Sequence, residues 1–377
     1  MPASVSVHLR QLEFGETRIP YHYGVGLEGG IPDLLRQGLG DADVLLFLVD
    51  GRLADTYQRL ARQLRPAFEV SSVEFEPSEY AKNLNAVGDI MEQAVARGVT
   101  RKSVIVALGG GTIGNIAGMV AALLFRGIRL VHLPTTPVGA FDSVISLKQA
   151  VNLTAGKNLC GTFFAPTLVA CDLDWLTTVP ARLLRTSLVE MAKNVLTTSP
   201  GQERKFLAAT ELLTVDQARA LESFLEIGIS AKQPLLRADG KEKREALVFE
   251  YGHTVGHAIE LASAGTVGHG EAVGWGMLVA AEISRARLDL SAEDLGTHTR
   301  LMGALGITRA TRPAVDLAAV GELVAKDNKR GYIACGPDEV AMVLLRSVGE
   351  VACSEPGMPL VPVPVEVLDG ALRTVLG

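Results

Sequence analysis

Three of the seven histidines lie close together in the sequence, at His253, His257 and His269. His253 and His257 are four residues apart, so on a helix their side chains share one face. His269 follows a glycine-containing turn that could return the chain to the same place. Two imidazoles, one carboxylate and an open position are the usual catalytic arrangement of zinc, so this cluster indicates a metal site. The spacing is not that of the HExxH metalloprotease motif. The alternative is that these are core, capping or surface histidines.

The carboxylate of such a site is less obvious from spacing. Glu190 is a candidate, because it lies on an otherwise apolar helical pattern where an unpaired carboxylate would be costly to bury. Lys193 follows one helical turn later and could be a simple salt-bridge partner. The spacing fits a metal ligand and a salt bridge equally well.

A glycine-rich turn, residues 109–115 (GGGTIGN), joins an apolar run to a helical pattern. Glycines let backbone N–H groups approach a pyrophosphate, and the N-terminus of a following helix favours negative charge. Asp50 ends an earlier apolar run and could bind a ribose hydroxyl. The turn therefore indicates a dinucleotide site, although it lacks the GxGxxG spacing. A tight turn without a ligand, with Asp50 as a helix cap, is the alternative.

Residues 140–158 form the densest polar stretch of the chain. Asp142, Lys148, Lys157 and Asn158 could place cations and amides around a phosphate. A solvated loop would show the same composition, and Arg126, just before an apolar run, has the same ambiguity.

Continuous apolar runs at 44–49, 103–108 and 128–133 predict buried parallel strands. Helical patterns such as 85–96 and 116–124 alternate with them, which predicts a doubly wound α/β domain. After about residue 172 the periodicity becomes mostly helical, at 180–196, 218–233, 270–289 and 318–324, with one short strand expected at 341–345. The chain of 377 residues is long for one core, so we expect two domains, 1–178 and 179–377.

Composition argues against a nucleic-acid-binding protein, a membrane protein and a disulfide-rich secreted protein. The net charge is −6, and no lysine- or arginine-rich run suits a nucleic-acid backbone. The apolar segments are too short to be membrane spans, and no signal peptide is visible. Four scattered cysteines without a CxxC pair suit a reducing cytoplasm.

Taken together, the motifs GGGTIGN, LPTTPVGAFDSVISLKQAVN, AGKN, VEMAKN, GHTVGHAIE and GHGEAV resemble the sugar phosphate cyclases, whose best-known member is 3-dehydroquinate synthase. The resemblance runs from about Asp50 to Gly331. It implies a Rossmann-like NAD-binding domain followed by a mostly helical domain for metal and substrate. It also implies a homodimer, in which Arg126 reaches the neighbouring subunit's site.

The resemblance assigns residues to roles. It implies that one divalent metal, zinc or cobalt, is bound by Glu190, His253 and His269. For NAD it implies contacts from Asp50, Glu79, Lys82, Gly110, Gly111, Thr112, Asn115, Thr135, Thr136, Asp142, Ser143, Lys148, Lys157 and Thr178. For the sugar phosphate it implies contacts from Arg126, Asp142, Lys148, Asn158, Lys193, Lys232, Glu250, His257 and Lys329, with Lys148, Lys193, Glu250 and His257 as catalytic residues.

Three departures from the dehydroquinate synthase pattern concern the substrate. Glu250 stands where those enzymes usually carry asparagine, Ala246 where an arginine binds the substrate carboxylate, and Asn115 where an acid is usual. A buried guanidinium facing an uncharged sugar would be an uncompensated charge, so its absence suits a substrate without a carboxylate. The segments 249–253 and 327–332 resemble the branch that forms 2-deoxy-scyllo-inosose from glucose 6-phosphate in aminoglycoside biosynthesis.

The expected reaction is a phosphate-eliminating cyclisation. Transient oxidation of C4 by NAD acidifies the C5 proton, phosphate leaves C6, hydride returns to C4, and an intramolecular aldol step closes the carbocycle. Glu250 is expected to be a general acid/base because it replaces an amide with a titratable group. The alternatives are 3-dehydroquinate synthase or another cyclase, a metal-dependent polyol dehydrogenase, and a non-catalytic NAD-binding partner protein.

Overall fold

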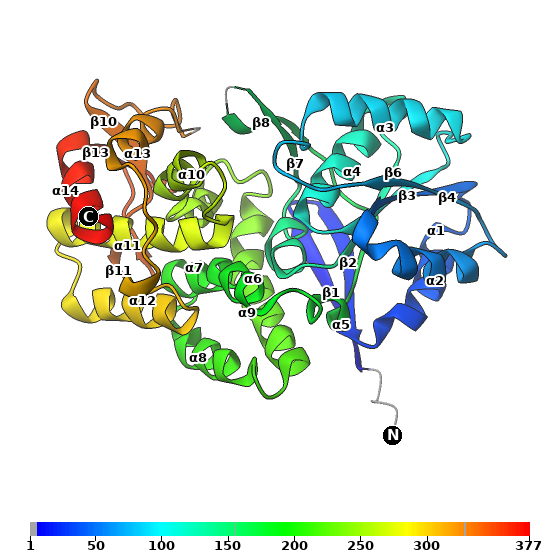
Figure 1. Cartoon of the computed structure of the whole chain (residues 1–377), viewed down its shortest axis with the longest axis horizontal. Helices are drawn as coiled ribbons and strands as arrows, with labels where there is room; N and C mark the ends of the chain where they lie inside the picture. Colours follow the sequence, from blue (N-terminus) through cyan, green and yellow to red (C-terminus); the bar gives the residue numbers. More distant parts are fainter. Residues whose placement is uncertain (1–5, 155, 328) are drawn as a thin grey trace. The chain divides into compact units, whose positions relative to one another are not determined.

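The computed structural model describes residues 6–154, 156–327 and 329–377. Ala155 of the AGKN motif and Asn328 of the 327–332 segment lie outside the described residues. The chain divides into two compact units, Met1–Val179 and Pro180–Gly377 (Figure 1). Within the described residues, no helix has both the length and the apolarity that crossing a bilayer requires.

The first unit is built on a seven-stranded sheet with the order β1-β2-β9-β6-β5-β3-β4. β2 pairs with β1 in antiparallel fashion and with β9 in parallel, and every other pairing in this sheet is parallel. The strands are β1 (Ser6–Phe14), β2 (Thr17–Val25), β3 (Val44–Asp50), β4 (Glu69–Phe75), β5 (Val104–Gly109), β6 (Arg129–Pro134) and β9 (Leu168–Asp172).

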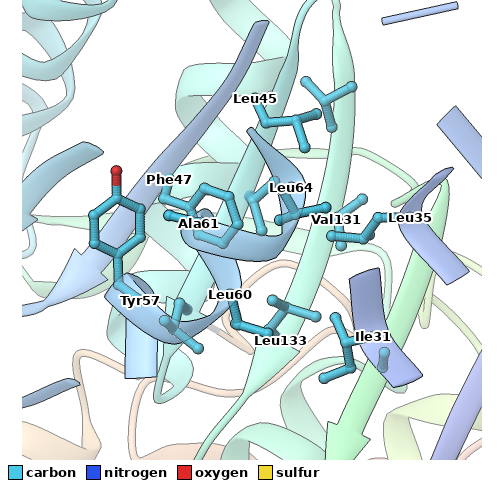
Figure 2. Close-up of a cluster of buried hydrophobic side chains, with 14 of the residues drawn as sticks. Ile31, Leu35, Leu45, Phe47, Tyr57, Leu60, Ala61, Leu64, Val131 and Leu133 are labelled. Carbon is cyan, nitrogen blue, oxygen red and sulfur yellow. The ribbon is translucent and has the colours of Figure 1, made fainter. Parts of the chain in front are cut away.

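Helices cover both faces of this sheet. α1 (Ile31–Leu39) and α2 (Ala54–Leu64) pack on one face, and α3 (Leu84–Ala96) and α4 (Gly111–Leu123) on the other. All of β3 is buried because its side chains alternate between these two layers. Leu45 and Phe47 point to the first layer, where they meet Leu60 and Leu64 of α2 (Figure 2). The expected doubly wound domain is therefore confirmed.

The sheet order changes direction at β3. The chain passes from β3 to β4 on one side, and β5 then pairs with β3 on the other side. The carboxyl ends of β3 and β5 consequently lie side by side, and that of β6 follows next to β5. In open α/β sheets such a switch point is where ligands bind. A separate hairpin, β7 (Lys148–Leu153) with β8 (Gly156–Phe163), packs on α4, and the short α5 (Leu173–Leu176) follows β9.

The second unit is mostly helical, as expected (Figure 1). Its helices are α6 (Ala181–Ser187), α7 (Val189–Thr197), α8 (Glu203–Leu212), α9 (Gln217–Ala238), α10 (His253–Ala262), α11 (His269–Leu288), α12 (Ala292–Ala304), α13 (Leu317–Val324) and α14 (Val365–Leu376). Its strands are β10 (Glu339–Met342), β11 (Leu345–Ser347), β12 (Glu350–Val351) and β13 (Val361–Pro364).

The single strand expected at 341–345 is wrong. The apolar run changes partner within this segment, because β10 pairs with β13 whereas β11 pairs with β12. Hydrophobicity continues across the break, since both pieces are buried, and so the pattern does not reveal it.

Candidate functional site

Three helices of the second unit bring the side chains of Glu190, His253 and His269 together. Glu190 lies near the start of α7, and the two histidines are the first residues of α10 and α11. One ligand atom of each residue lies within 4.8 Å of the others. The Nε2 atoms of His253 and His269 are 3.4 and 3.6 Å from Oε1 of Glu190. One carboxylate and two imidazoles thus face a common centre, as a divalent cation requires.

Each imidazole is held through its other nitrogen. Nδ1 of His253 is 3.2 Å from the carbonyl oxygen of Tyr251, and Nδ1 of His269 is 3.3 Å from Oε2 of Glu260. Both oxygens are acceptors, so Nδ1 of each ring carries a hydrogen, and in the neutral ring Nε2 presents its lone pair to the centre. Metal-binding histidines are usually oriented by such outer contacts.

The buried carboxylate of Glu190 is only half satisfied by protein groups. Its Oε2 accepts a hydrogen bond from the ammonium of Lys193, whereas among the described residues nothing donates a hydrogen bond to the buried Oε1. Burial opposes ionisation, but the Lys193 ammonium and the imidazoles of His253 and His269 together outweigh it and hold the pKa of Glu190 well below its usual value. An ionised oxygen facing two nitrogen lone pairs needs a positive charge between them, and a divalent metal ion fits this donor set.

The two histidines differ electrostatically. Burial lowers the pKa of His253 to about 3, so this imidazole is neutral near pH 7. Burial also acts to lower the pKa of His269, but the carboxylates of Glu190 and Glu260 raise it overall, to about 9. A proton on His269 and a metal ion are therefore alternative ways to neutralise the centre, and metal binding would release that proton.

Glycines let the ligand-bearing helices approach at backbone contact. A methyl group at Gly270, the residue after His269, would lie 1.9 Å from the carbonyl oxygen of Thr186 in α6. A methyl at Gly276 of α11 would lie 2.0 Å from the carbonyl oxygen of Gly252, the residue before His253. Only hydrogen fits at these two positions, so the close packing that fixes both histidines depends on glycine.

Other expected substrate residues lie in the same unit as the triad. The ring of His257 is 5.3 Å from that of His253 and 6.0 Å from that of His269, measured between centroids. Nζ of Lys329, which is 2% exposed, lies 3.0 Å from Asp327 and 3.4 Å from Glu250.

The carboxylate of Asp327 is also 4.0 Å from Nδ1 of His257. The ammonium of the buried Lys232 lies 5.3 Å from the centre of the Phe249 ring. Lys329, Asp327, Glu250 and His257 thus form one connected group in the second unit, and His257 joins it to the candidate metal centre.

In the first unit, several of the expected NAD residues lie at the switch point of the sheet. Asp50 ends β3, Gly110 and Gly111 follow β5 at the start of α4, and Thr135 follows β6. A side chain at Gly110 would lie 3.1 Å from Thr136, so the turn is tight. Among the residues that the structure describes, no side chain caps the N-terminus of α4, which suits an anionic ligand. Thr112 is in this first turn.

Asp50 already has protein partners. Its carboxylate accepts hydrogen bonds from the backbone N–H of Arg52 at 3.1 Å and from the guanidinium of Arg52 at 2.9 and 2.5 Å. The structure thus shows the capping role considered as an alternative. The ribose contact stays a prediction, and it would require the exposed Arg52 side chain to share this carboxylate.

Several residues of the polar stretch are ordered by the β7–β8 hairpin. Lys148 begins β7, so a solvated loop is the wrong description for this part of the stretch. Nζ of Lys82 donates to Oδ1 of Asn158 at 2.6 Å, and Lys157 pairs with Glu79 at 3.1 Å. Asn152 joins the two pairs, because it donates to Glu79 and accepts from the backbone N–H of Asn158.

Asn115 ties α4 to this hairpin. Its amide donates to the carbonyl of Gly111 and accepts from the N–H of Ala150, both at 2.9 Å. Asp142 and Ser143 lie in the turn Gly139–Ser143, with the Ser143 hydroxyl 3.6 Å from where a methyl at Gly111 would be.

Thr178 and Arg126 lie elsewhere in the first unit. The hydroxyl of Thr178 donates to the carbonyl of Trp175 at 2.7 Å and so satisfies the end of α5. Arg126 is exposed beyond the C-terminal end of α4, about 20 Å along that helix from the glycine turn. It therefore lies away from the switch point of its own unit.

Two residues of the second unit were not assigned a role from the sequence. Glu260 contacts His269, and Asp327 contacts both His257 and Lys329. The sequence spacing could indicate the role of Glu260, because residues three and seven positions after His257 and His253 lie on the same helix face as these histidines. For Asp327, the one indication in the sequence is that it lies two residues before Lys329.

Comparison with known proteins agrees with both units. Residues 72–186 match the family model of the 3-dehydroquinate synthase N-terminal domain, and residues 188–330 match that of the C-terminal domain. These matches place the chain in the class of 3-dehydroquinate synthase-like proteins, as the motifs indicated.

Similar sequences and solved structures identify the family within this class to which the chain belongs. The chain is 43% identical to the 2-deoxy-scyllo-inosose synthase of Streptomyces paromomycinus, over 97% of this chain and 95% of the relative. It is 42% identical to the synthase of Streptoalloteichus tenebrarius, over 96% and 94% of the two chains. A crystal structure of 2-deoxy-scyllo-inosose synthase with carbaglucose-6-phosphate, NAD⁺ and Co²⁺ superposes with a TM-score of 0.91 at 34% identity, covering 98% of this chain and all of the other. The chain belongs to the 2-deoxy-scyllo-inosose synthase family.

Proposed function

We propose that the protein converts D-glucose 6-phosphate into 2-deoxy-scyllo-inosose and phosphate, as a carbon–oxygen lyase of aminoglycoside biosynthesis. The observation that carries the proposal is the convergence of Glu190, His253 and His269 on one centre, with the buried Oε1 of Glu190 lacking a hydrogen-bond donor among the described residues. A related synthase binds a glucose 6-phosphate analogue with NAD⁺ and Co²⁺. This chain offers matching ligand chemistry in its second unit and a nucleotide-binding turn in its first.

The proposed cofactors are NAD and one divalent cation, zinc or cobalt. When bound, NAD takes a hydride from C4 and returns it, and the cation polarises the C4 oxygen. The turn at Gly110 and Gly111 would bind the pyrophosphate through its N–H groups and the start of α4. Glu190, His253 and His269 would bind the cation.

The chain's own titratable groups would serve the steps between the two hydride transfers. Glu250 would move the proton at C5 or C6, with the ammonium of Lys329, 3.4 Å away, holding its carboxylate in place. Lys193 would orient the sugar while it keeps Glu190 ionised, and His257 would exchange protons with the sugar hydroxyls. Lys148, Lys232 and Asn158 would bind the departing phosphate or the sugar.

The choice of substrate rests on Ala246 and Glu250. The side chain of Ala246 is an uncharged methyl group, so this position offers no cation to a substrate carboxylate. Glu250 would repel a carboxylate in its vicinity. Both features favour a neutral sugar over the keto-acid phosphate that 3-dehydroquinate synthase uses.

The test is to incubate the purified protein with glucose 6-phosphate, Co²⁺ and catalytic NAD⁺. We expect one phosphate and one carbocyclic ketone per sugar, without net formation of NADH. Glu190→Gln, which keeps the shape of the side chain but removes its charge, should abolish both products. Stoichiometric NADH would instead establish a dehydrogenase, and phosphate release only from a seven-carbon keto-acid phosphate would establish a dehydroquinate synthase.

We also propose that the protein is a homodimer in which Arg126 serves the partner's substrate. The support is the position of Arg126 at the far end of α4 from the glycine turn. Arg126→Ala and Glu190→Gln subunits should each be inactive alone and regain activity when mixed, because a mixed dimer contains one complete site. If light scattering shows dimers and co-purification of a tagged with an untagged subunit shows exchange, no recovery of activity in the mixture would refute this arrangement.

A further inference from the structure

We propose that Glu260 is a positioning residue of the metal centre, which it supports by fixing the orientation of His269 and supplying a negative charge. The inference rests on the proposed metal-dependent function and extends it to a residue outside the ligand set. Oε2 of Glu260 lies 3.3 Å from Nδ1 of His269, and the side chain of Glu260 is only 10% exposed.

The placement of Glu260 follows from the geometry of α10. His253, His257 and Glu260 are separated by four and three residues, so all three lie on one face of this helix. α10 packs closely against α11, whose first residue is His269. One helix therefore supplies a metal ligand through His253 and the outer contact of another ligand through Glu260.

The charge balance of the centre explains why this contact is a carboxylate. His253 is held by a neutral carbonyl, that of Tyr251. Glu190, the one anionic ligand, forms an ion pair with Lys193, so its charge is largely neutralised before a cation binds. Glu260 would add negative charge to the centre through its contact with the imidazole of His269.

Two variants separate orientation from charge. Glu260→Gln keeps an oxygen that can accept the Nδ1 hydrogen of His269 but removes the charge. Glu260→Ala removes both. We expect outer contacts of this kind to change metal affinity by roughly 10- to 100-fold, with the glutamine variant near the lower value and the alanine variant near the upper one.

Glu271→Gln is the matched control. Glu271 is a buried carboxylate in the first turn of α11, two residues after His269, but its ion-pair partner is Arg182 at 2.8 Å. Removing its charge alters the same helix end without removing the contact to His269. This variant should bind metal as the wild type does, to within about threefold, since its carboxylate is not the outer contact of a ligand.

The experiment titrates full-length, metal-free protein with Co²⁺ and follows the visible absorption of the bound ion. Besides the weaker binding, Glu260→Ala saturated with Co²⁺ should show a changed band shape, because His269 is no longer held at the metal. Equal loss of affinity in the Glu260→Gln and Glu271→Gln variants would overturn the proposal, as would wild-type affinity in the alanine variant. If Glu260→Ala does not fold, the proposal is tested by comparing the Co²⁺ affinities of Glu260→Gln and Glu271→Gln. Failure of the wild type to release phosphate from glucose 6-phosphate would refute the proposed function but leave this comparison intact.

Discussion

The contact between α11 and α6 is expected to hold His269 in place at the candidate metal centre. Gly270 follows His269 directly, and it faces the carbonyl of Thr186, four residues before Glu190. We predict that Gly270→Ala weakens both the fold of the second unit and its affinity for a divalent cation, although the substituted side chain binds neither metal nor substrate.

The magnitude follows from the distances. The added methyl would lie 1.9 Å from the carbonyl oxygen of Thr186, whereas ordinary contact begins at 3.4 Å, so the backbones must separate by about 1.5 Å. Overpacking of this kind costs about 1–3 kcal/mol. A zinc–nitrogen bond is about 2.0–2.1 Å long and tolerates only about 0.2 Å of change, so a displaced His269 binds poorly. If the strain is relieved by moving His269, affinity should fall about 5- to 150-fold.

Gly268→Ala is the matched control. Gly268 precedes His269, a methyl there would have no atom within 4 Å, and its φ of −70° suits alanine. This variant should bind metal normally and be unchanged or more stable, by about 0.4–1 kcal/mol, because alanine restricts the unfolded chain.

The assays are urea unfolding of the metal-free protein and Co²⁺ titration followed by absorption. Wild-type affinity and stability in Gly270→Ala would refute the idea that the α6–α11 contact positions His269. Equal losses in both variants would attribute the effect to the turn before α11 rather than to the contact.

Three further outcomes follow from the same geometry. Removing the metal with a chelator should lower the melting temperature. A metal at 100 times its Kd stabilises the folded state by about 2.7 kcal/mol, which is roughly 5–10 °C for a unit of 198 residues (377 − 179). An unchanged melting curve would mean that no metal is bound in the folded state. Burial lowers the pKa of His298 to about 4, below its unfolded value, so its contribution of about 3 kcal/mol is full above pH 6.5 and is lost as pH falls toward 4. His298→Gln should flatten the pH dependence of urea unfolding across this interval, and an unchanged slope would contradict the assignment. Glu250→Gln should lose phosphate release while NAD⁺ affinity, measured by calorimetry, stays the same; normal turnover would exclude Glu250 as the acid/base.

Local patterns in the sequence were enough to predict much of the fold. β3 and β5 are nearly continuous apolar runs because both faces of the sheet are covered by helices. The alternation of Ile19, Tyr21 and Tyr23 in β2, all buried, is a strand signal that the sequence also contains. The change of partner between β10 and β11 could not be predicted, because it depends on strands further along the chain.

Some features of the candidate site could likewise be predicted from the sequence, and others could not. The spacing of His253 and His257 indicated a shared helix face, and its extension to Glu260 was available in the sequence. The carbonyl of Tyr251 carries no side-chain signal. The contacts of Gly270 with Thr186 and of Gly276 with Gly252 join segments far apart in sequence, so residue types alone do not reveal them. The pairing of Lys82 with Asn158 is hidden for the same reason.

The expected ligands of the two cofactors occupy separate, uninterrupted stretches of the chain. Every residue proposed for NAD precedes Val179, and every residue proposed for the metal follows Pro180. A single recombination event at this boundary would therefore exchange one cofactor apparatus and leave the other intact. Hybrids that join halves of two related synthases at residues 179 and 180 would inherit nucleotide affinity from one parent and metal preference from the other.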